Sequence, residues 1–194
     1  MAVPASGIKQ LHEIKSFADF DGNIGTCQLD APGAPCTTML WKFCLGGDAY
    51  FAEIPKRLSD ITIEEAKSLL QRVPDDEIYP KIPQDSRLTV VPTTSVPLFV
   101  KRPALIHYDI PGDHSWIGEL LLSEAQIMER VSKTPHENIV QYYGCFVEDG
   151  RLKGIALKRY GCTLAEHFQD GHGPLKDHEA FMRSWSRQYT ICTP

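Results

Sequence analysis

Residues 116–133 predict one long amphipathic helix with a carboxylate inside its apolar stripe. At about 100° per residue, Glu124 falls near the middle of an arc of apolar side chains. Because burying an unpaired carboxylate costs several kcal/mol, a cation should meet Glu124. The plain alternative is that Glu124 lies at the edge of the helix and reaches solvent along its stem. The apolar arc consists of Ile117, Leu120, Leu121, Ile127, Met128 and Val131.

Lys101 is the best candidate for that cation. It ends the β-rich run "PLFVK" (97–101) and precedes the helix in sequence. A lysine at the end of a strand is more often simply solvated, so the pairing depends on where the helix lies. Asp113 or Ser115 can cap the helix, and Pro135 ends it by disfavouring helical geometry at Thr134.

Two hairpins flank this region. The runs "TTMLWKFCL" and "AYFAEI" surround Gly46-Gly47-Asp48, and "NIVQYYGCFV" and "RLKGIALKRY" surround Glu148-Asp149-Gly150. Glycine and aspartate at these positions favour tight turns. "RLTVV" (87–91) should form a further short strand, joined to "PLFVK" by "PTTSV".

The remaining elements are weaker. Thr62 and Glu65 stand at capping-box spacing and open a predicted helix over 62–73, followed by the proline-spaced linker "VPDDEIYPKIPQD" (73–85). Residues 1–36 are rich in glycine and proline and are expected to be a loosely ordered lead-in. Short helices are expected from Thr163 and from Asp177, and the final "SRQYTICTP" should be poorly packed.

Composition excludes several classes of function. A hydrophobic content of 42% and a formal net charge of -5 indicate a globular protein without a basic nucleic-acid-binding surface. No apolar run reaches the length of a signal peptide or membrane span, so we expect an intracellular, cytoplasmic protein without a membrane partner. The six cysteines show no metal-ligand spacing, so we expect reduced thiols and no metal site.

Three motifs together resemble the small lobe of a eukaryotic protein kinase: "FVK" (99–101), "EAQIM" (124–128) and "PHENIV" (135–140). The wording "LFVKRP", "NIVQYYGC" and "YGCTLAEHF" is similar to a divergent kinase-like family abundant in filamentous fungi. The similarity covers about residues 87–183, roughly half of the chain.

The resemblance implies roles for four residues. In protein kinases the strand lysine contacts the α- and β-phosphates of ATP and pairs with the helix glutamate. Lys101 would therefore hold phosphate and Glu124 would orient it. Leu157 to Tyr160 would form the hinge behind the adenine ring, with Leu157 at the rear of the pocket. His136 would be a loop residue with a packing role.

The sequence departs from the kinase pattern in two ways. No glycine occurs between Gly47 and Lys101, so a glycine-rich loop over the phosphates is missing. No H-R-D-x-x-x-x-N loop and no D-F-G occur after residue 160, so the chain is expected to stop short of its chemistry. ATP and Mg²⁺ are thus implied by the family alone, with weak or absent binding and no catalytic residue.

These expectations give an α+β fold: a kinase small lobe of antiparallel sheet plus one long helix, with an N-terminal hairpin-helix extension and a short helical C-terminal piece. The predicted divisions are 1–36, 37–86 and 87–194. The predicted function is that of a protein kinase-like protein of the ATP-dependent Ser/Thr phosphotransfer family, inactive as this truncated chain. Two alternatives stay open: a non-catalytic, pseudokinase-like module that binds a protein on the exposed lower face of the lobe, and a truncated product without its own role.

Overall fold

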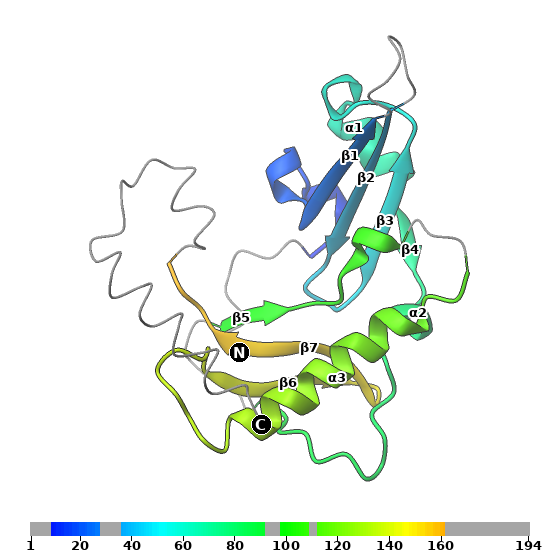
Figure 1. Cartoon of the computed structure of the whole chain (residues 1–194). Coiled ribbons are helices and arrows are strands. Elements are labelled where there is room, and N and C mark those ends of the chain that lie inside the picture. The colour runs from blue at the N-terminus through cyan, green and yellow to red at the C-terminus, as the bar shows by residue number, and fades with distance from the viewer. Residues whose placement is uncertain (1–8, 28–35, 92–97, 109–111, 162–194) are drawn as a thin grey trace.

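The computed structural model describes residues 9–27, 36–91, 98–108 and 112–161, and Figure 1 shows their arrangement. Two antiparallel sheets and a few helices make up this part of the chain, which confirms the α+β class. The strand order is β1-β2-β3-β4 in the first sheet and β5-β7-β6 in the second. The long helix α3 (Ser115–Val131) packs against the second sheet.

The first sheet is built on the hairpin that the sequence predicts. Strands β2 (Cys36–Phe43) and β3 (Ala49–Ile54) pair antiparallel, with Phe43 opposite Ala49. The turn between them closes with a hydrogen bond from Cys44 N–H to Asp48 O at 2.8 Å, and Gly47 adopts a φ of 86°. Glycine reaches this left-handed region without steric cost, which explains its place in the turn.

The helix predicted over 62–73 is shorter than expected. Helix α1 spans Ile63–Leu69, and its N-cap Thr62 accepts a hydrogen bond from Glu65 N–H at 3.2 Å, as the capping pattern indicates. Gln71–Val73 instead forms strand β4, which pairs with β3 and buries Val73 to 2% exposure. Strand pairing and burial of Val73 outweigh the helical periodicity there.

Residues 9–27 are more ordered than a loose lead-in. They form two single-turn helices, Leu11–Glu13 and Phe17–Asp19, and strand β1 (Gly22–Cys27), which pairs with β2. Ile14 and Phe20 are buried in the core beneath this sheet. The Asp21 carboxylate accepts a hydrogen bond from Phe43 N–H at 2.6 Å, so the segment is tied to β2 by polar contacts as well. Residues 1–8 and 28–35 lie outside the described residues.

The predicted linker over 73–85 also contributes to the core. Helix α2 (Asp75–Ile78) follows β4, and both Ile78 and Tyr79 are fully buried. The Tyr79 hydroxyl donates to Gly47 O at 2.8 Å. Lys153 of the second sheet lies over the Tyr79 ring at 4.0 Å and pairs with Asp75. This segment therefore packs against both sheets and is more than a linker between them.

The second sheet contains β5 (Leu98–Lys101), β6 (Tyr142–Glu148) and β7 (Arg151–Lys158). The predicted hairpin between β6 and β7 is confirmed, with Asp149 and Gly150 in a two-residue turn at φ 49° and 71°. The strand predicted over 87–91 is reduced to one isolated bridge. It makes a single parallel bridge, Val90 to Cys145, on the outer edge of β6.

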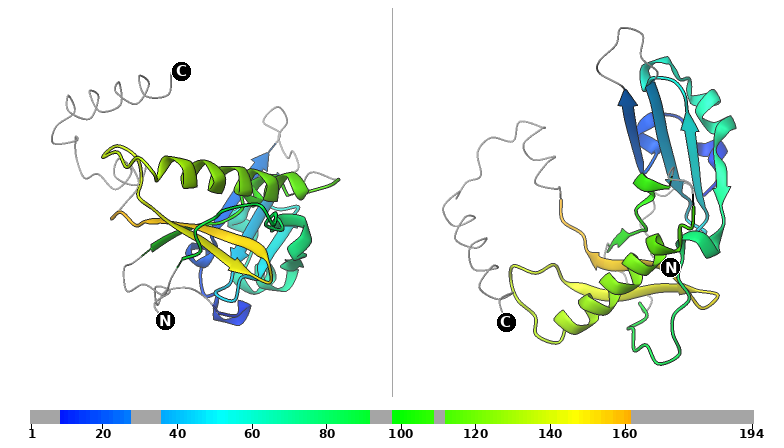
Figure 2. Two further views of the ribbon diagram at one scale, coloured as in Figure 1. Left: turned by 90° about the horizontal axis from the view of Figure 1, so that it is seen from below. Right: turned by 45° about the vertical axis from the view of Figure 1, so that its right-hand side comes forward.

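Helix α3 (Ser115–Val131) runs along one face of the second sheet (Figure 2). The Asp113 carboxylate accepts a hydrogen bond from Ser115 N–H at 2.8 Å, which satisfies part of the first turn. Leu121 and Ala125 pack against Cys145, Leu152, Ile155 and Leu157 of the sheet. The start of the helix reaches the first sheet, where Ile117 shares a cluster with Phe51 and Val73.

Other expectations have mixed outcomes. Cys36 is disulfide-bonded, so the expectation of reduced thiols throughout is wrong, whereas Cys44 and Cys145 are free and buried. The helices predicted from Thr163 and Asp177, and the C-terminal "SRQYTICTP", lie outside the described residues. Among the helices of the described part, none is long and apolar enough to cross a membrane.

Candidate functional site

Lys101 and Glu124 form the ion pair that the sequence predicts. Lys101 Nζ lies 2.6 Å from Glu124 Oε1, and the lysine donates a hydrogen bond to the carboxylate. The Lys101 side chain is 45% exposed and the Glu124 side chain 34% exposed. Both charges therefore remain in contact with solvent, and a ligand can reach them.

Strand register places Lys101 on the face of the sheet that carries α3. Lys101 lies opposite Ile155, and Phe99 lies opposite Leu157. Directly opposite residues in an antiparallel pair project to the same face. Because Ile155 and Leu157 pack under α3, Lys101 and Phe99 must project to that side as well. The lysine thus reaches α3 from the strand at the sheet's edge.

Glu124 lies at the boundary of the buried face of α3, not at its centre. The buried residues are Ile117, Gly118, Leu121 and Ala125, whereas Leu120 is 61% exposed and Ile127 is 46% exposed. The expectation that the whole apolar arc is buried is therefore wrong. Half of the arc faces the sheet and half faces solvent, and Glu124 separates the two halves.

A pocket of about 420 Å³ adjoins the ion pair. One wall is the chain leaving β5, from Lys101 to Ala104, and the other is the exposed flank of α3. The α3 wall includes Trp116, Leu120 and Ile127. A largely apolar pocket with Lys101, Arg102 and Glu124 among its lining residues is suited to a ligand that has both an apolar and an anionic part.

Distance alone does not single out this ion pair. Lys56 Nζ also lies 2.6 Å from Glu65 Oε1, and those side chains are 48% and 30% exposed. What distinguishes Lys101 and Glu124 is the pocket beside them and their origin in a strand and a helix 23 residues apart. The Lys56–Glu65 pair therefore provides a matched reference for experiments.

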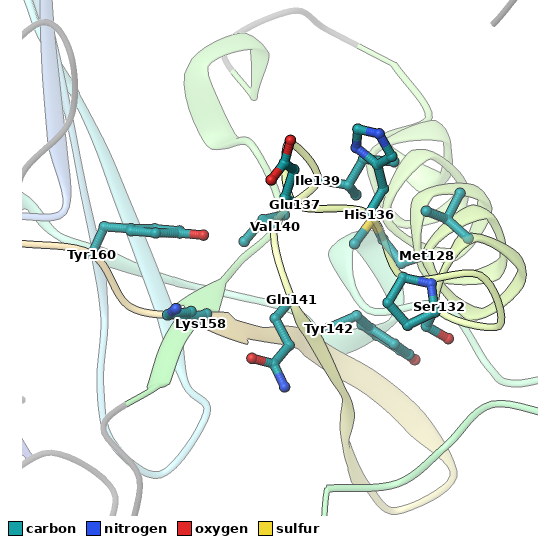
Figure 3. Close-up of a pocket in the computed structure, with 12 residues that line it drawn as sticks. Met128, Ser132, His136, Glu137, Ile139, Val140, Gln141, Tyr142, Lys158 and Tyr160 are labelled. Atoms are coloured by element: carbon teal, nitrogen blue, oxygen red, sulfur yellow. The ribbon is translucent and has the colours of Figure 1, made fainter. Parts of the chain in front are cut away.

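The other two predicted binding residues lie elsewhere. Leu157 is 8% exposed and belongs to the core between the sheet and α3, where it lines none of the pockets described here. Tyr160 is 57% exposed and lines a second pocket of about 450 Å³ (Figure 3). In that view Tyr160 and Lys158 stand on one side, and His136 and Met128 on the other. The structure thus brings Lys101 and Glu124 together and leaves Leu157 and Tyr160 outside their pocket.

His136 belongs to this second pocket as a loop residue. Its Nδ1 accepts a hydrogen bond from Asn138 N–H at 3.2 Å, which fixes the turn after Pro135. Within the described ranges, no group of three or more His, Cys, Asp or Glu side chains is placed to hold a metal ion.

Sequence reasoning missed a polar cluster on the opposite flank of α3. Glu129 accepts hydrogen bonds from Thr89 N–H at 2.9 Å, from the Thr89 hydroxyl at 2.7 Å and from the Tyr142 hydroxyl at 2.9 Å. This cluster holds residues 87–91 against β6. Burial raises the pKa of the Cys145 thiol beside Tyr142, so Cys145 is not suited to act as a nucleophile. The only sequence signal was a glutamate that falls outside the apolar arc of the helix.

Comparisons of the chain with protein-family models, with curated proteins and with solved structures found no match. The site must therefore be interpreted from its own geometry.

Proposed function

We propose that this chain is a protein kinase-like protein in which Lys101 binds the phosphates of a nucleotide and Glu124 orients the lysine, without phosphoryl transfer by the 194-residue polypeptide. The observation that carries the proposal is the 2.6 Å contact between a strand-end lysine and a glutamate in the middle of the long helix. A kinase small lobe uses the same two residue types on the same two kinds of element.

The surroundings of Lys101 support an anionic ligand. Its ammonium group is nearly half exposed, so phosphate can approach it without unfolding any element. Glu124 neutralises the lysine in the free protein and holds its stem in place beside the apolar pocket. A bound phosphate would share the ammonium with Glu124, since one ammonium has three donors.

Binding should be weak for two physical reasons. The sequence has no glycine between Gly47 and Lys101, so no glycine-rich loop can bring backbone N–H groups close to the phosphates. Among the described residues, the pocket is lined by residues 101–104 and by α3, which leaves much of a purine in water. We expect a dissociation constant of about 1 mM or weaker, equivalent to no more than about 4 kcal/mol.

Phosphoryl transfer is not expected from this polypeptide. The reaction needs an aspartate that accepts the proton of the substrate hydroxyl and side chains that hold magnesium. The sequence contains neither the H-R-D-x-x-x-x-N loop nor D-F-G. Lys101 and Glu124 can position phosphate, but neither can replace those groups.

A calorimetric titration with Mg-ATP tests the binding half of the proposal. Wild type should give a weak heat of binding that disappears in Lys101→Met and persists in the matched variant Lys56→Met. Equal loss in both variants would show that the effect is one of net charge alone. Unchanged binding by Lys101→Met would refute the assignment of the site.

A transfer assay with radiolabelled ATP and a generic basic protein tests the catalytic half. We expect no incorporation above a no-enzyme control. Label incorporation that survives repurification and is lost in Lys101→Met would contradict the absence of catalysis.

A non-catalytic protein-binding module is the second candidate, and one observation favours it. Trp116, Leu120 and Ile127 present an exposed apolar flank on α3, and isolated contiguous patches of this kind often mark interaction surfaces. Under this alternative, Lys101→Met leaves binding of the protein partner intact and Leu120→Glu abolishes it. The two candidates therefore differ in what they predict for Lys101→Met, which abolishes nucleotide binding under the first and leaves protein binding intact under the second.

A further inference from the structure

The two edges of the second sheet differ in how they are covered. At the β6 edge, Cys145 N–H donates to Thr89 O at 2.7 Å and Val91 N–H donates to Cys145 O at 3.0 Å, so residues 89–91 occupy it. At the opposite edge, β5 pairs with β7 alone among the strands of the described ranges. An uncovered edge strand presents a row of backbone donors and acceptors to any chain that fits.

The exposed flank of α3 extends past this open edge. Glu129, on one side of the helix, bonds to Tyr142 of β6, and Glu124, on the other side, bonds to Lys101 of β5. Leu120 and Ile127 lie further round the helix than Glu124 and away from β6. In the described part of the chain the sheet ends at β5 before reaching them, which leaves both side chains exposed. One more strand beside β5 would lie under these two side chains.

β5 itself carries a side chain that suits this space. Phe99 is 52% exposed and projects to the α3 face, like Lys101 two residues later. The apolar pocket beginning at Lys101 is on the same face. A projecting aromatic side chain and an apolar pocket therefore lie two residues apart on one edge strand.

We propose that β5 pairs antiparallel with β5 of a second copy of this chain, about a two-fold axis at Val100, with Phe99 of each copy filling the pocket beside Lys101 of the other. The axis stands perpendicular to the sheet, so α3 of both copies lies on the same face. In this arrangement, two directly opposite residues project to the same face of the joined sheet only when the sum of their residue numbers is even.

Two prolines decide which of these possible registers is formed. Pro97 and Pro103 lack the N–H needed for a ladder and bound a five-residue stretch, 98–102, whose centre is Val100. When the numbers of opposite residues add to 200, the whole stretch 98–102 is paired and Phe99 of one copy lies opposite Lys101 of the other. A sum of 202 would place the two Lys101 residues directly opposite each other, which is unfavourable.

Charge does not oppose the pairing. Each Lys101 is neutralised by Glu124 of its own copy, and Arg102 donates to Lys153 O of its own copy at 3.0 Å. The paired stretch is short, so the contact belongs to the small, transient class of interfaces and should form in the micromolar to millimolar range. The inference does not depend on nucleotide binding at Lys101.

Sedimentation velocity of the full chain tests the association. From about 1 µM to about 1 mM, wild type should convert from monomer to dimer and stop there, because an isologous contact closes. Phe99→Glu and Leu120→Glu should remain monomeric over this range. Val90→Glu changes an equally exposed side chain at the other edge of the sheet and should dimerise like wild type.

Cysteine cross-linking tests the register. Residues directly opposite in a strand pair have Cβ atoms about 5 Å apart, so Val100→Cys should form a covalent dimer on mild oxidation. Wild type and Val90→Cys under the same oxidant give the background. A monomer at all concentrations, a dimer indifferent to Phe99→Glu, growth beyond a dimer, or Val100→Cys cross-linking no better than Val90→Cys would each overturn the proposal. Circular dichroism of each variant confirms that it is folded.

Discussion

Removing the Lys101–Glu124 ion pair should cost the fold little. The two side chains are 45% and 34% exposed, so water screens their attraction. Double-mutant cycles on solvent-exposed ion pairs give about 0.2–1 kcal/mol, whereas breaking a fully buried pair costs about 3–5 kcal/mol. The exposed fractions put this pair in the first class, and we expect a coupling energy of about 0.5 kcal/mol.

A double-mutant cycle measured by urea unfolding tests this value. The cycle uses wild type, Lys101→Met, Glu124→Gln and the double variant, and a second cycle with Lys56→Met and Glu65→Gln supplies the matched reference. Because distance and exposure agree between the pairs, their coupling energies should agree within about 0.5 kcal/mol. A coupling above about 3 kcal/mol for Lys101 and Glu124 alone would refute the reasoning and assign the pair to stability.

Three further predictions concern the sheet under α3. Leu152→Ala should lower the free energy of unfolding by about 2–5 kcal/mol because Leu152 is fully buried, as urea unfolding would show. Gly144→Ala should cost about 1–3 kcal/mol and free residues 87–91 to hydrogen exchange, because φ is 132° and a Cβ would lie 2.6 Å from Thr89 O; unchanged exchange would contradict this. Burial alone would raise the pKa of Glu129, but hydrogen bonds from Thr89 and Tyr142 outweigh burial and lower the pKa below its ordinary 4.5. Glu129 therefore stabilises the fold above that pH and loses this contribution as the pH falls through its folded-state pKa, so Glu129→Gln should flatten the acid limb of the stability profile.

Turns, a helix cap and an ion pair could be predicted from the sequence because particular residue types favour them. Asp149 and Gly150 adopt the positive φ angles that their residue types favour, and Thr62 caps α1 as its spacing indicates. Lys101 could be matched to Glu124 because a carboxylate among apolar residues is an unusual feature. Each of these depends on residues close in sequence or on a charge that requires a partner.

The misses have one physical cause, which is tertiary contact. Strand β1 lies in the glycine-rich segment that was expected to be loosely ordered, yet pairing with β2 makes it a strand. Gln71–Val73 continues a helical period but is captured by β3. The exposed half of the α3 arc could not be recognised because helical periodicity does not reveal where the neighbouring sheet ends.

The most direct test of the proposed site is nuclear magnetic resonance of the lysine side chains. In protein with isotope-labelled lysine, Lys101→Arg and Lys56→Arg assign the two signals that matter, one from each ion pair. On addition of Mg-ATP, the Lys101 signal should move progressively over the millimolar range while the Lys56 signal stays in place. A stationary Lys101 signal, or an equal shift of both lysines, would contradict the assignment of Lys101 and Glu124 to a phosphate-binding site.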